Sequence, residues 1–177
     1  TFGSDLTMSL SRIGHGNALS PDVYRSRPVQ AMESAAADYA CLLNDVLSYR
    51  KEIEFEGEIH NAVLVVQNFL DCGPQEAMGV VGDLMAARMQ EFQHITETQL
   101  PALFEEFGLD GAARKGLLGY AQELRDWMAG ILSWHRGCTR YREETLLRDF
   151  PHIAAAVPAQ PWRTPLGNAD GLGRSAV

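Results

Sequence analysis

The sequence predicts an all-α protein, and three observations support this prediction. Between Val29 and Phe55 the apolar residues recur three or four positions apart, the spacing that buries one face of a helix. These residues are Met32, Ala36, Tyr39, Leu43 and Leu47. Glycine and proline interrupt the chain at intervals typical of helix lengths. The one run with strand propensity, Val63 to Leu70, has no second strand with which it can pair.

Caps and breakers bound the first two helices. Residues 4–14 are expected to form a short helix that ends at the sequence Gly-His-Gly-Asn of residues 14–17. Ser20 followed by Pro21 predicts an N-cap and the first position of a second short helix, which extends to Arg27.

The next helix is predicted to run from about Val29 to Phe55 and to be ended by Gly57. Because Val63 to Leu70 is strongly apolar and flanked by helices, we interpret it as a buried helix.

Two further long helices are predicted. One follows Gly73 and Pro74 to about Gln99 and continues past Pro101 with a kink or a restart. Asp110 can cap the last helix, which is expected to end near Phe150. Residues 1–150 are therefore expected to form one domain, and the Pro/Gly-rich residues 151–177 an extended or disordered tail.

Composition narrows the classes of function. The chain has 177 residues, 46% of them hydrophobic, which is enough for one core of ordinary size. Its net charge of -8 argues against a surface that binds nucleic acid. Three cysteines without a CxxC spacing indicate reduced thiols in a cytoplasmic protein. We expect no membrane association, since no stretch approaches the roughly 20 apolar residues of a membrane span and no signal peptide is visible.

The most informative motif is formed by Asn44, Ser48 and Glu52, which stand at i, i+4 and i+8. On an α-helix each step of four advances roughly 6 Å and turns about 40°, so the three side chains share one narrow strip. Their amide, hydroxyl and carboxylate oxygens are hard donors with one formal charge among them, which suits Mg²⁺. Lys51 stands beside Glu52 and can reach a phosphate bound to that metal. The alternative is a polar helix face without a metal.

The spacing also constrains how such a site is built. Oxygens that share one Mg²⁺ lie about 3 Å apart, whereas the Cα atoms of Asn44 and Glu52 lie about 12 Å apart along the helix axis. The long Glu52 side chain must therefore lean toward the helix N-terminus, and Asn44 must lean the other way, with Ser48 between them.

A second motif lies near the end of the last predicted helix. Arg140 and Tyr141 are adjacent, and Trp134 stands six residues before Arg140. Arginine offers a forked, permanently charged donor and tyrosine a hydroxyl, and both suit diphosphate oxygens. Trp127, Trp134 and Phe69 are candidates for the wall of an apolar cavity in which aromatic faces stabilise carbocations, or for ordinary core residues.

These motifs resemble those of class I terpenoid synthases, in which an asparagine/serine/glutamate triad is preceded by a lysine and an arginine-tyrosine pair lies near the C-terminus. Three segments closely resemble the C-terminal domain of bacterial germacradienol/geosmin synthases. They are TFGSDLTMSL, NDVLSYRKEIEFEGEIHNAVLVVQNFLD (residues 44–71) and WMAGILSWHRGCTRY. The resemblance implies the C-terminal part of a class I terpenoid synthase helical bundle.

The resemblance also implies a chemistry. Mg²⁺ bound by Asn44, Ser48 and Glu52 would hold a diphosphate together with Lys51, Arg140 and Tyr141. In that family one domain converts farnesyl diphosphate to germacradienol, and a second converts germacradienol to geosmin with release of acetone. The expected ligands are thus an isoprenyl diphosphate or a terpene alcohol, and pyrophosphate.

The family's aspartate-rich metal motif has no counterpart here, because the sequence contains no adjacent aspartates. We therefore expect the chain to supply one wall of an active site, to be inactive alone, and to expose an apolar face that favours a homodimer. Two alternatives stay open. One is another bacterial sesquiterpene or methylisoborneol-type cyclase, and the other is a non-catalytic helical interaction domain.

Overall fold

The computed structural model describes residues 3–15 and 19–154, and every regular element in these ranges is a helix. The predicted all-α fold is confirmed. The helices are α1 (Ser4–Gly14), α2 (Pro21–Arg25), α3 (Arg27–Arg50), α4 (Ala62–Leu70), α5 (Pro74–His94), α6 (Leu100–Glu106), α7 (Gly111–Gly137), α8 (Glu143–Asp149) and α9 (Pro151–Ala154). Two π-helical segments, η2 (Lys51–Glu56) and η3 (Ile95–Gln99), continue α3 and α5.

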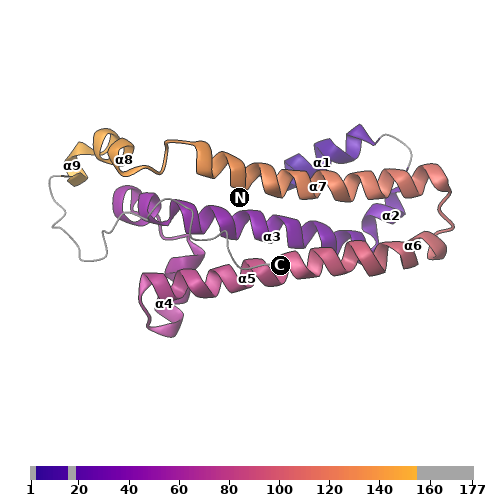
Figure 1. Cartoon of the computed structure of the whole chain (residues 1–177), viewed down its shortest axis with the longest axis horizontal. Coiled ribbons are helices and arrows are strands. Elements are labelled where there is room, and N and C mark those ends of the chain that lie inside the picture. Colours follow the sequence, from indigo (N-terminus) through magenta and orange to yellow (C-terminus); the bar gives the residue numbers. More distant parts are fainter. Residues whose placement is uncertain (1–2, 16–18, 155–177) are drawn as a thin grey trace.

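Three long helices form an elongated bundle, in which α3 lies between α5 and α7 (Figure 1). The apolar face predicted for the third helix is buried in this bundle, with Met32, Ala36 and Leu43 almost fully covered. The main core also contains Phe92 from α5 and Leu124 from α7. None of the described helices is long and apolar enough to cross a membrane.

The predicted caps form as the sequence suggests. The Ser20 hydroxyl accepts a hydrogen bond from the N–H of Val23 at the start of α2. Asp110 Oδ1 accepts one from the N–H of Ala113, 2.8 Å away, at the start of α7. Such side chains satisfy backbone donors that have no partner within the first helical turn, which fixes where each helix begins.

The end of the triad helix differs from a regular α-helix. From Lys51 to Glu56 the chain is wound as a π-helix, and it ends at Gly57 with a φ of 68°. In that left-handed conformation, which glycine adopts without strain, the N–H of Gly57 and that of Glu58 both bond the carbonyl oxygen of Glu52. The predicted stop at Gly57 is confirmed. The predicted continuation of the helix past Pro101 is also found, through η3 and then α6.

The last long helix was predicted to end near Phe150, and this is wrong. α7 ends at Gly137, and Cys138 is extended with a ψ of 151°. Glycine, cysteine and threonine follow one another at residues 137–139, and all three have low helix propensity, which favours the end of the helix here. The N–H of Arg142 then bonds the carbonyl oxygen of Thr139, and α8 begins at the next residue.

The apolar run Val63 to Leu70 is a helix, as predicted, but it is not buried as a whole. Val63 is covered, whereas Val65 and Leu70 are exposed and Phe69 is 85% exposed. α4 packs on α3 and α5 along one face only (Figure 1). Phe69 is therefore neither a core residue nor part of a cavity wall in the described structure.

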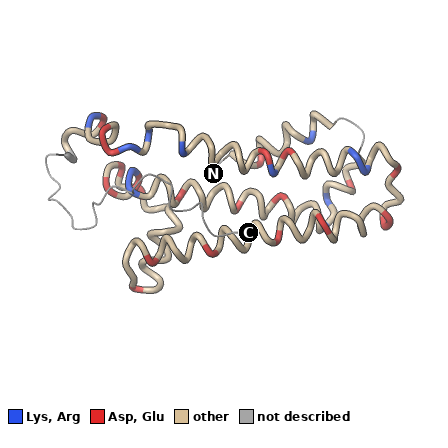
Figure 2. Tube along the Cα trace, in the orientation of Figure 1, with Lys and Arg blue, Asp and Glu red and all other residues tan. Residues whose placement is uncertain are grey.

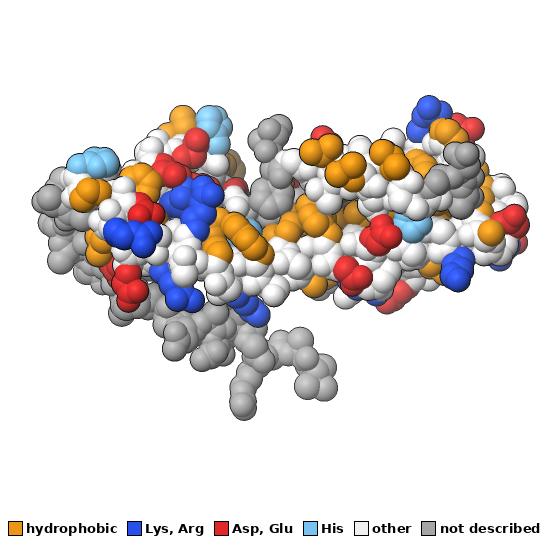
Figure 3. Space-filling model, turned by 90° about the horizontal axis from the view of Figure 1, so that it is seen from above, with side chains coloured by type: hydrophobic (Ala, Val, Ile, Leu, Met, Phe, Trp, Pro, Cys, Tyr) orange, Lys and Arg blue, Asp and Glu red, His pale blue; other side chains and the backbone are white. Residues whose placement is uncertain are grey.

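Apolar side chains also reach the surface elsewhere, as the view from above shows (Figure 3). On α1 the exposed residues Leu6, Leu10 and Ile13 form one stripe. At the other end of the chain, residues 151–154 form the short helix α9 where an extended tail was expected. The rest of that predicted tail, residues 155–177, lies outside the described residues.

Candidate metal and diphosphate site

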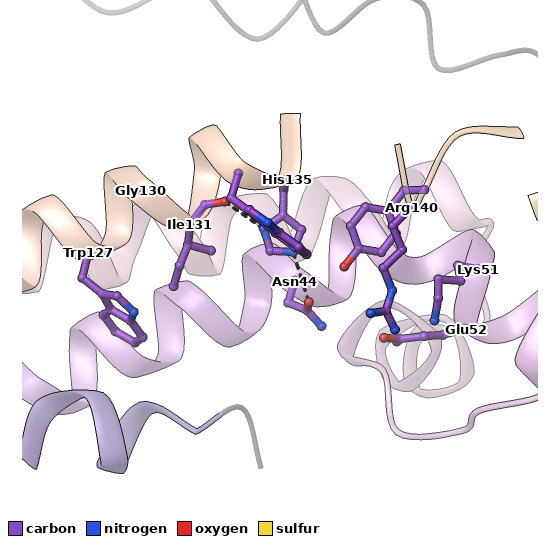
Figure 4. A pocket seen from close by; sticks show the side chains of 10 residues that line it. Asn44, Lys51, Glu52, Trp127, Gly130, Ile131, His135 and Arg140 are labelled. Atoms are coloured by element: carbon purple, nitrogen blue, oxygen red, sulfur yellow. Dashed lines mark hydrogen bonds between the residues drawn. The ribbon is translucent and has the colours of Figure 1, made fainter. Parts of the chain in front are cut away.

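A pocket of about 500 Å³ opens between the C-terminal ends of α3 and α7. Five of the six site residues predicted from the sequence line it: Asn44, Lys51, Glu52, Arg140 and Tyr141. Asn44 lies on α3 and Lys51 and Glu52 on η2, whereas Arg140 and Tyr141 lie in the connection that follows α7 (Figure 4). Residues about 90 positions apart in sequence thus meet in one pocket.

Ser48, the sixth predicted residue, does not line the pocket. Ser48 is 1% exposed, and its hydroxyl donates a hydrogen bond to the carbonyl oxygen of Asn44 at 2.6 Å. The Nδ2 of Asn44 lies 3.5 Å from the same hydroxyl oxygen. A hydroxyl that donates a hydrogen bond still has lone pairs on its oxygen. The Ser48 oxygen, close to the Asn44 amide, can therefore still act as a metal ligand.

Glu52 is held by a residue that does not line the pocket. Its Oε2 accepts a hydrogen bond of 3.0 Å from Nδ2 of Asn61, the N-cap residue of α4. Asn61 was not among the residues predicted for the site. A capping signal was available, because an asparagine directly before an apolar helical run is typical of an N-cap.

His135 joins the two helices of the pocket and was also missed. Its Nε2 lies 3.1 Å from Oδ1 of Asn44, and its Nδ1 lies 2.8 Å from the carbonyl oxygen of Ile131 (Figure 4). The ring stacks on Tyr141, with centroids 5.4 Å apart and planes at 11°. His135 therefore fixes Asn44 relative to the segment that carries Arg140 and Tyr141.

The connection after α7 is anchored at its far end as well. Charged residues of both signs gather where η2 and α8 meet (Figure 2). There Arg50 donates to Glu143 of α8 at 2.8 Å and to Glu54 at 3.2 Å. With His135 holding one end and Arg50 the other, Arg140 and Tyr141 are kept beside the pocket.

The pocket has a charged end and an apolar end. Lys51, Arg140 and Glu52 lie together at one end, and Ile131 and Trp127 extend toward the other (Figure 4). Trp134 lines the same pocket. Two of the three aromatic residues predicted for a cavity wall are thus found in one, and these ring faces can stabilise a cation nearby.

Neighbouring groups determine the pairing and the protonation of the side chains at the charged end of the pocket. Lys51 is almost fully buried and forms an ion pair with Glu56. Burial raises the pKa of the Tyr141 hydroxyl, and the nearby charge of Arg140 only partly opposes this. The hydroxyl therefore keeps its proton at neutral pH and can donate a hydrogen bond.

The donor chemistry of this pocket fits a hard divalent cation. Asn44 and Glu52 present an amide and a carboxylate at its wall, and Ser48 adds a hydroxyl oxygen behind them. Oxygen donors with a single negative charge suit Mg²⁺, which retains water and accepts further ligands from phosphates. These residues therefore have the right chemistry to hold such an ion.

Asp45 connects α3 to the loop behind the pocket, and its pKa has a testable consequence. Its Oδ2 accepts the N–H of Ala62 at 2.8 Å. Burial raises the pKa of this carboxyl, the bond from Ala62 opposes the rise, and the charge of Glu52 adds to it. A carboxyl whose pKa is raised on folding favours the folded state when protonated, and this stabilisation is lost as pH rises through the folded pKa.

We therefore expect Asp45→Asn to gain stability relative to the wild type as pH rises from about 4 to about 7. The asparagine oxygen can still accept the bond from Ala62, but no charge is buried. Thermal unfolding of both proteins across this range measures the difference. A difference in Tm that stays constant with pH would contradict the expectation.

Comparison with known protein families assigns the part of the chain that carries the triad. The family model described as "Terpene synthase family 2, C-terminal metal binding" matches residues 1–91. This part includes α1 to α4 and most of α5, and with them Asn44, Ser48 and Glu52. α7 and the Arg140–Tyr141 pair lie outside it.

Curated relatives agree with this match. Pristinol synthase of Streptomyces pristinaespiralis is 30% identical over 72% of this chain and 34% of its own length. Isoafricanol synthase of Streptomyces violaceusniger is 31% identical over 81% of this chain and 37% of its own. The (+)-T-muurolol synthase of Roseiflexus castenholzii, named as cyclizing (2E,6E)-farnesyl diphosphate, is 35% identical over 64% of this chain and 32% of its own.

The chain thus spans about a third of the length of these relatives. The predicted resemblance to class I terpene synthases is confirmed at the level of the family. Because the family model covers more than half of the 177 residues, the chain belongs to terpene synthase family 2 and includes residues of its C-terminal metal-binding domain.

Proposed function

We propose that this chain forms one wall of the active site of a Mg²⁺-dependent terpene cyclase that acts on an isoprenyl diphosphate and releases pyrophosphate. The pocket between α3 and α7 is the observation that supports this proposal. Its charged end carries Lys51, Arg140 and Glu52, and its other end is lined by Trp127 and Ile131. A substrate with a diphosphate head and a hydrocarbon chain needs both kinds of surface side by side.

In this proposal Asn44, Ser48 and Glu52 hold the metal. Bound Mg²⁺ supplies positive charge that stabilises the departing diphosphate. Lys51 and Arg140 donate hydrogen bonds to diphosphate oxygens, for which Lys51 exchanges its partner Glu56 for the ligand. An acidic chain with a net charge of -8 binds such an anion only where cations are concentrated in this way.

The remaining pocket residues act on the hydrocarbon. The faces of Trp127 and Trp134 stabilise the positive charge that develops on the substrate when the C–O bond breaks. Together with Ile131 they exclude water, which would otherwise quench the cation. The Tyr141 hydroxyl, which is kept protonated, donates to the diphosphate.

The substrate and product are further parts of the proposal. The segments 1–10, 44–71 and 127–141 favour the germacradienol/geosmin type, which converts farnesyl diphosphate to germacradienol and then to geosmin. A second candidate is a cyclase that makes a different product from farnesyl diphosphate, and the name of the Roseiflexus relative, which includes this substrate, favours it.

We propose that the chain by itself is inactive, because it spans about a third of its catalytic relatives. The exposed stripe of Leu6, Leu10 and Ile13 on α1 favours burial against further protein, which includes a second copy of the chain.

Product analysis tests the proposal. The complete protein that contains this chain is incubated with farnesyl diphosphate and Mg²⁺, and the extract is analysed by gas chromatography–mass spectrometry, with a Mg²⁺-free sample as control. Geosmin with germacradienol is the expected result. A different terpene would support the second candidate. The absence of product with and without Mg²⁺ would favour a non-catalytic helical domain.

A further inference from the structure

Asn61, which lies between η2 and α4, is 1% exposed and uses its whole side-chain amide. Nδ2 donates to the carbonyl oxygen of Asp45 at 2.8 Å and to Oε2 of Glu52 at 3.0 Å. Oδ1 accepts the N–H of Val63 at 2.9 Å. A side-chain amide has two hydrogens to donate, and both are engaged here. Asn61 therefore joins α3, η2 and α4 at one point.

Capping of α4 does not by itself require an asparagine. The cap uses only Oδ1, and serine, threonine and aspartate serve the same purpose at an N-cap. The bond to Glu52 is different, because it needs a donor that reaches across from the cap. Among the side chains that make good N-caps, only that of asparagine combines an acceptor with two N–H donors. The residue type thus matches the bond to Glu52 as well as the cap.

Asn61 is itself held in place by hydrogen bonds to α3. Its neighbour Ala62 donates to Oδ2 of Asp45, while Nδ2 of Asn61 donates to the backbone of the same residue. Two hydrogen bonds to one residue of α3 determine the position of the amide. The nitrogen that donates to Glu52 therefore has little freedom to move.

Glu52 is then held at both ends. Its backbone carbonyl accepts the N–H groups of Gly57 and Glu58, and its Oε2 accepts Nδ2 of Asn61. Glu52 lines the pocket, and Oε2 is the oxygen occupied from behind. The other carboxylate oxygen, Oε1, has no hydrogen-bond partner among the described residues and can bind a ligand.

We propose that Asn61 is a positioning residue that orients the Glu52 carboxylate for a divalent cation in the pocket. This inference rests on the proposed function, because it concerns the same metal site. Residues that orient a metal ligand from behind commonly change metal affinity by about 10- to 100-fold when they are replaced. Asn61 touches neither the cation nor the substrate in this proposal and acts only through Glu52.

The test is a Mn²⁺ titration of the complete protein in the presence of inorganic pyrophosphate, followed by electron paramagnetic resonance. Asn61→Ser keeps an N-cap acceptor but cannot reach Glu52. We expect its Mn²⁺ affinity to fall by about 10-fold or more. Val63→Ala is the matched control, since it removes buried volume from the same helix start without touching Glu52. Its affinity should stay within about twofold of the wild type.

Further variants separate the possible outcomes. If Asn61→Ser does not fold, Asn61→Thr, which also offers a capping hydroxyl but cannot reach Glu52, takes its place. Glu52→Gln should lose Mn²⁺ affinity, and adding Asn61→Ser to it should cause no further loss, because Asn61 acts through that carboxylate. Wild-type affinity in Asn61→Ser, with affinity lost in Glu52→Gln, would overturn this inference alone. Wild-type affinity in Glu52→Gln would overturn the proposed metal site itself.

Discussion

Replacement of Glu33 with alanine is expected to lower the free energy of unfolding by about 3 kcal/mol. Glu33 lies on α3 and is 7% exposed. Its carboxylate accepts hydrogen bonds from Nε and Nη2 along one edge of the Arg12 guanidinium on α1, and Nε lies 2.9 Å from Oε1. The Tyr120 hydroxyl on α7 donates to the same Oε1 at 2.6 Å. Alanine leaves both donors without their acceptor.

The expected loss of stability depends on the two groups, Arg12 and Tyr120, that Glu33→Ala leaves without their acceptor. Breaking a buried ion pair costs about 3–5 kcal/mol when the remaining charge stays buried. The Arg12 side chain is 34% exposed and can regain some water, so we expect the lower part of this range. Burial first, and then the hydrogen bond to Glu33, raises the pKa of Tyr120 above its usual range. Its hydroxyl remains a neutral donor at neutral pH and is costly to leave unpaired.

Urea denaturation of the wild type and the variant measures this difference. Tyr120→Phe removes only the hydroxyl and should cost about 1 kcal/mol. Glu33→Gln keeps an acceptor for Tyr120 but loses the charge, so it should fall between the other two. An unfolding midpoint for Glu33→Ala equal to that of the wild type would contradict the prediction.

This network also bears on the pocket. Arg12, Glu33 and Tyr120 tie α1, α3 and α7 together at the end of the bundle away from η2. The pocket lies between the other ends of α3 and α7, where His135 bonds Asn44. α3 and α7 are therefore fastened at both ends by polar contacts. These contacts have a direction and a fixed length, unlike the apolar packing between them, and so set the relative placement of the two pocket walls.

Most of the fold could be predicted because the signals are local. Ser20, Asp110 and Gly57 each mark a helix end through a property of one residue, namely a short polar side chain or tolerance of positive φ. The end of α7 was missed because residues 138–150 contain no strong breaker such as proline, and the low helix propensity of residues 137–139 was overlooked. Burial of α4 was overestimated because the composition of residues 63–70 does not reveal how many neighbours the helix has.

The candidate site also has one part that could be predicted from the sequence and another that could not. The spacing of Asn44 and Glu52 was sufficient to predict that both reach one pocket, although Glu52 lies on η2 and not on α3. The rotamer of Ser48, which turns toward the backbone of its own helix, is a choice between nearly equivalent local bonds that spacing cannot decide. His135 and Asn61 contact residues 91 and 9 positions away, and such contacts depend on the tertiary arrangement.

In the complete protein, Glu52→Gln is expected to lower Mg²⁺-dependent turnover of farnesyl diphosphate by about 100-fold or more. The change keeps the shape of the side chain but removes the one formal negative charge of the triad. The new amide nitrogen can also face Nδ2 of Asn61, which has only hydrogens to offer, so the bond that holds this side chain is weakened. Loss of charge and loss of orientation therefore act in the same direction.

Initial rates at several Mg²⁺ concentrations measure the effect and its origin. If the glutamate binds the metal, the variant needs more Mg²⁺ for half-maximal rate, and its Tm stays near that of the wild type. Glu58→Gln is the matched control, because it removes one charge six residues away on an exposed side chain outside the pocket. Its rate should stay within about twofold of the wild type. Near-normal turnover in Glu52→Gln would mean that this carboxylate is not a metal ligand, and the charged end of the pocket would then bind the diphosphate through Lys51 and Arg140 alone.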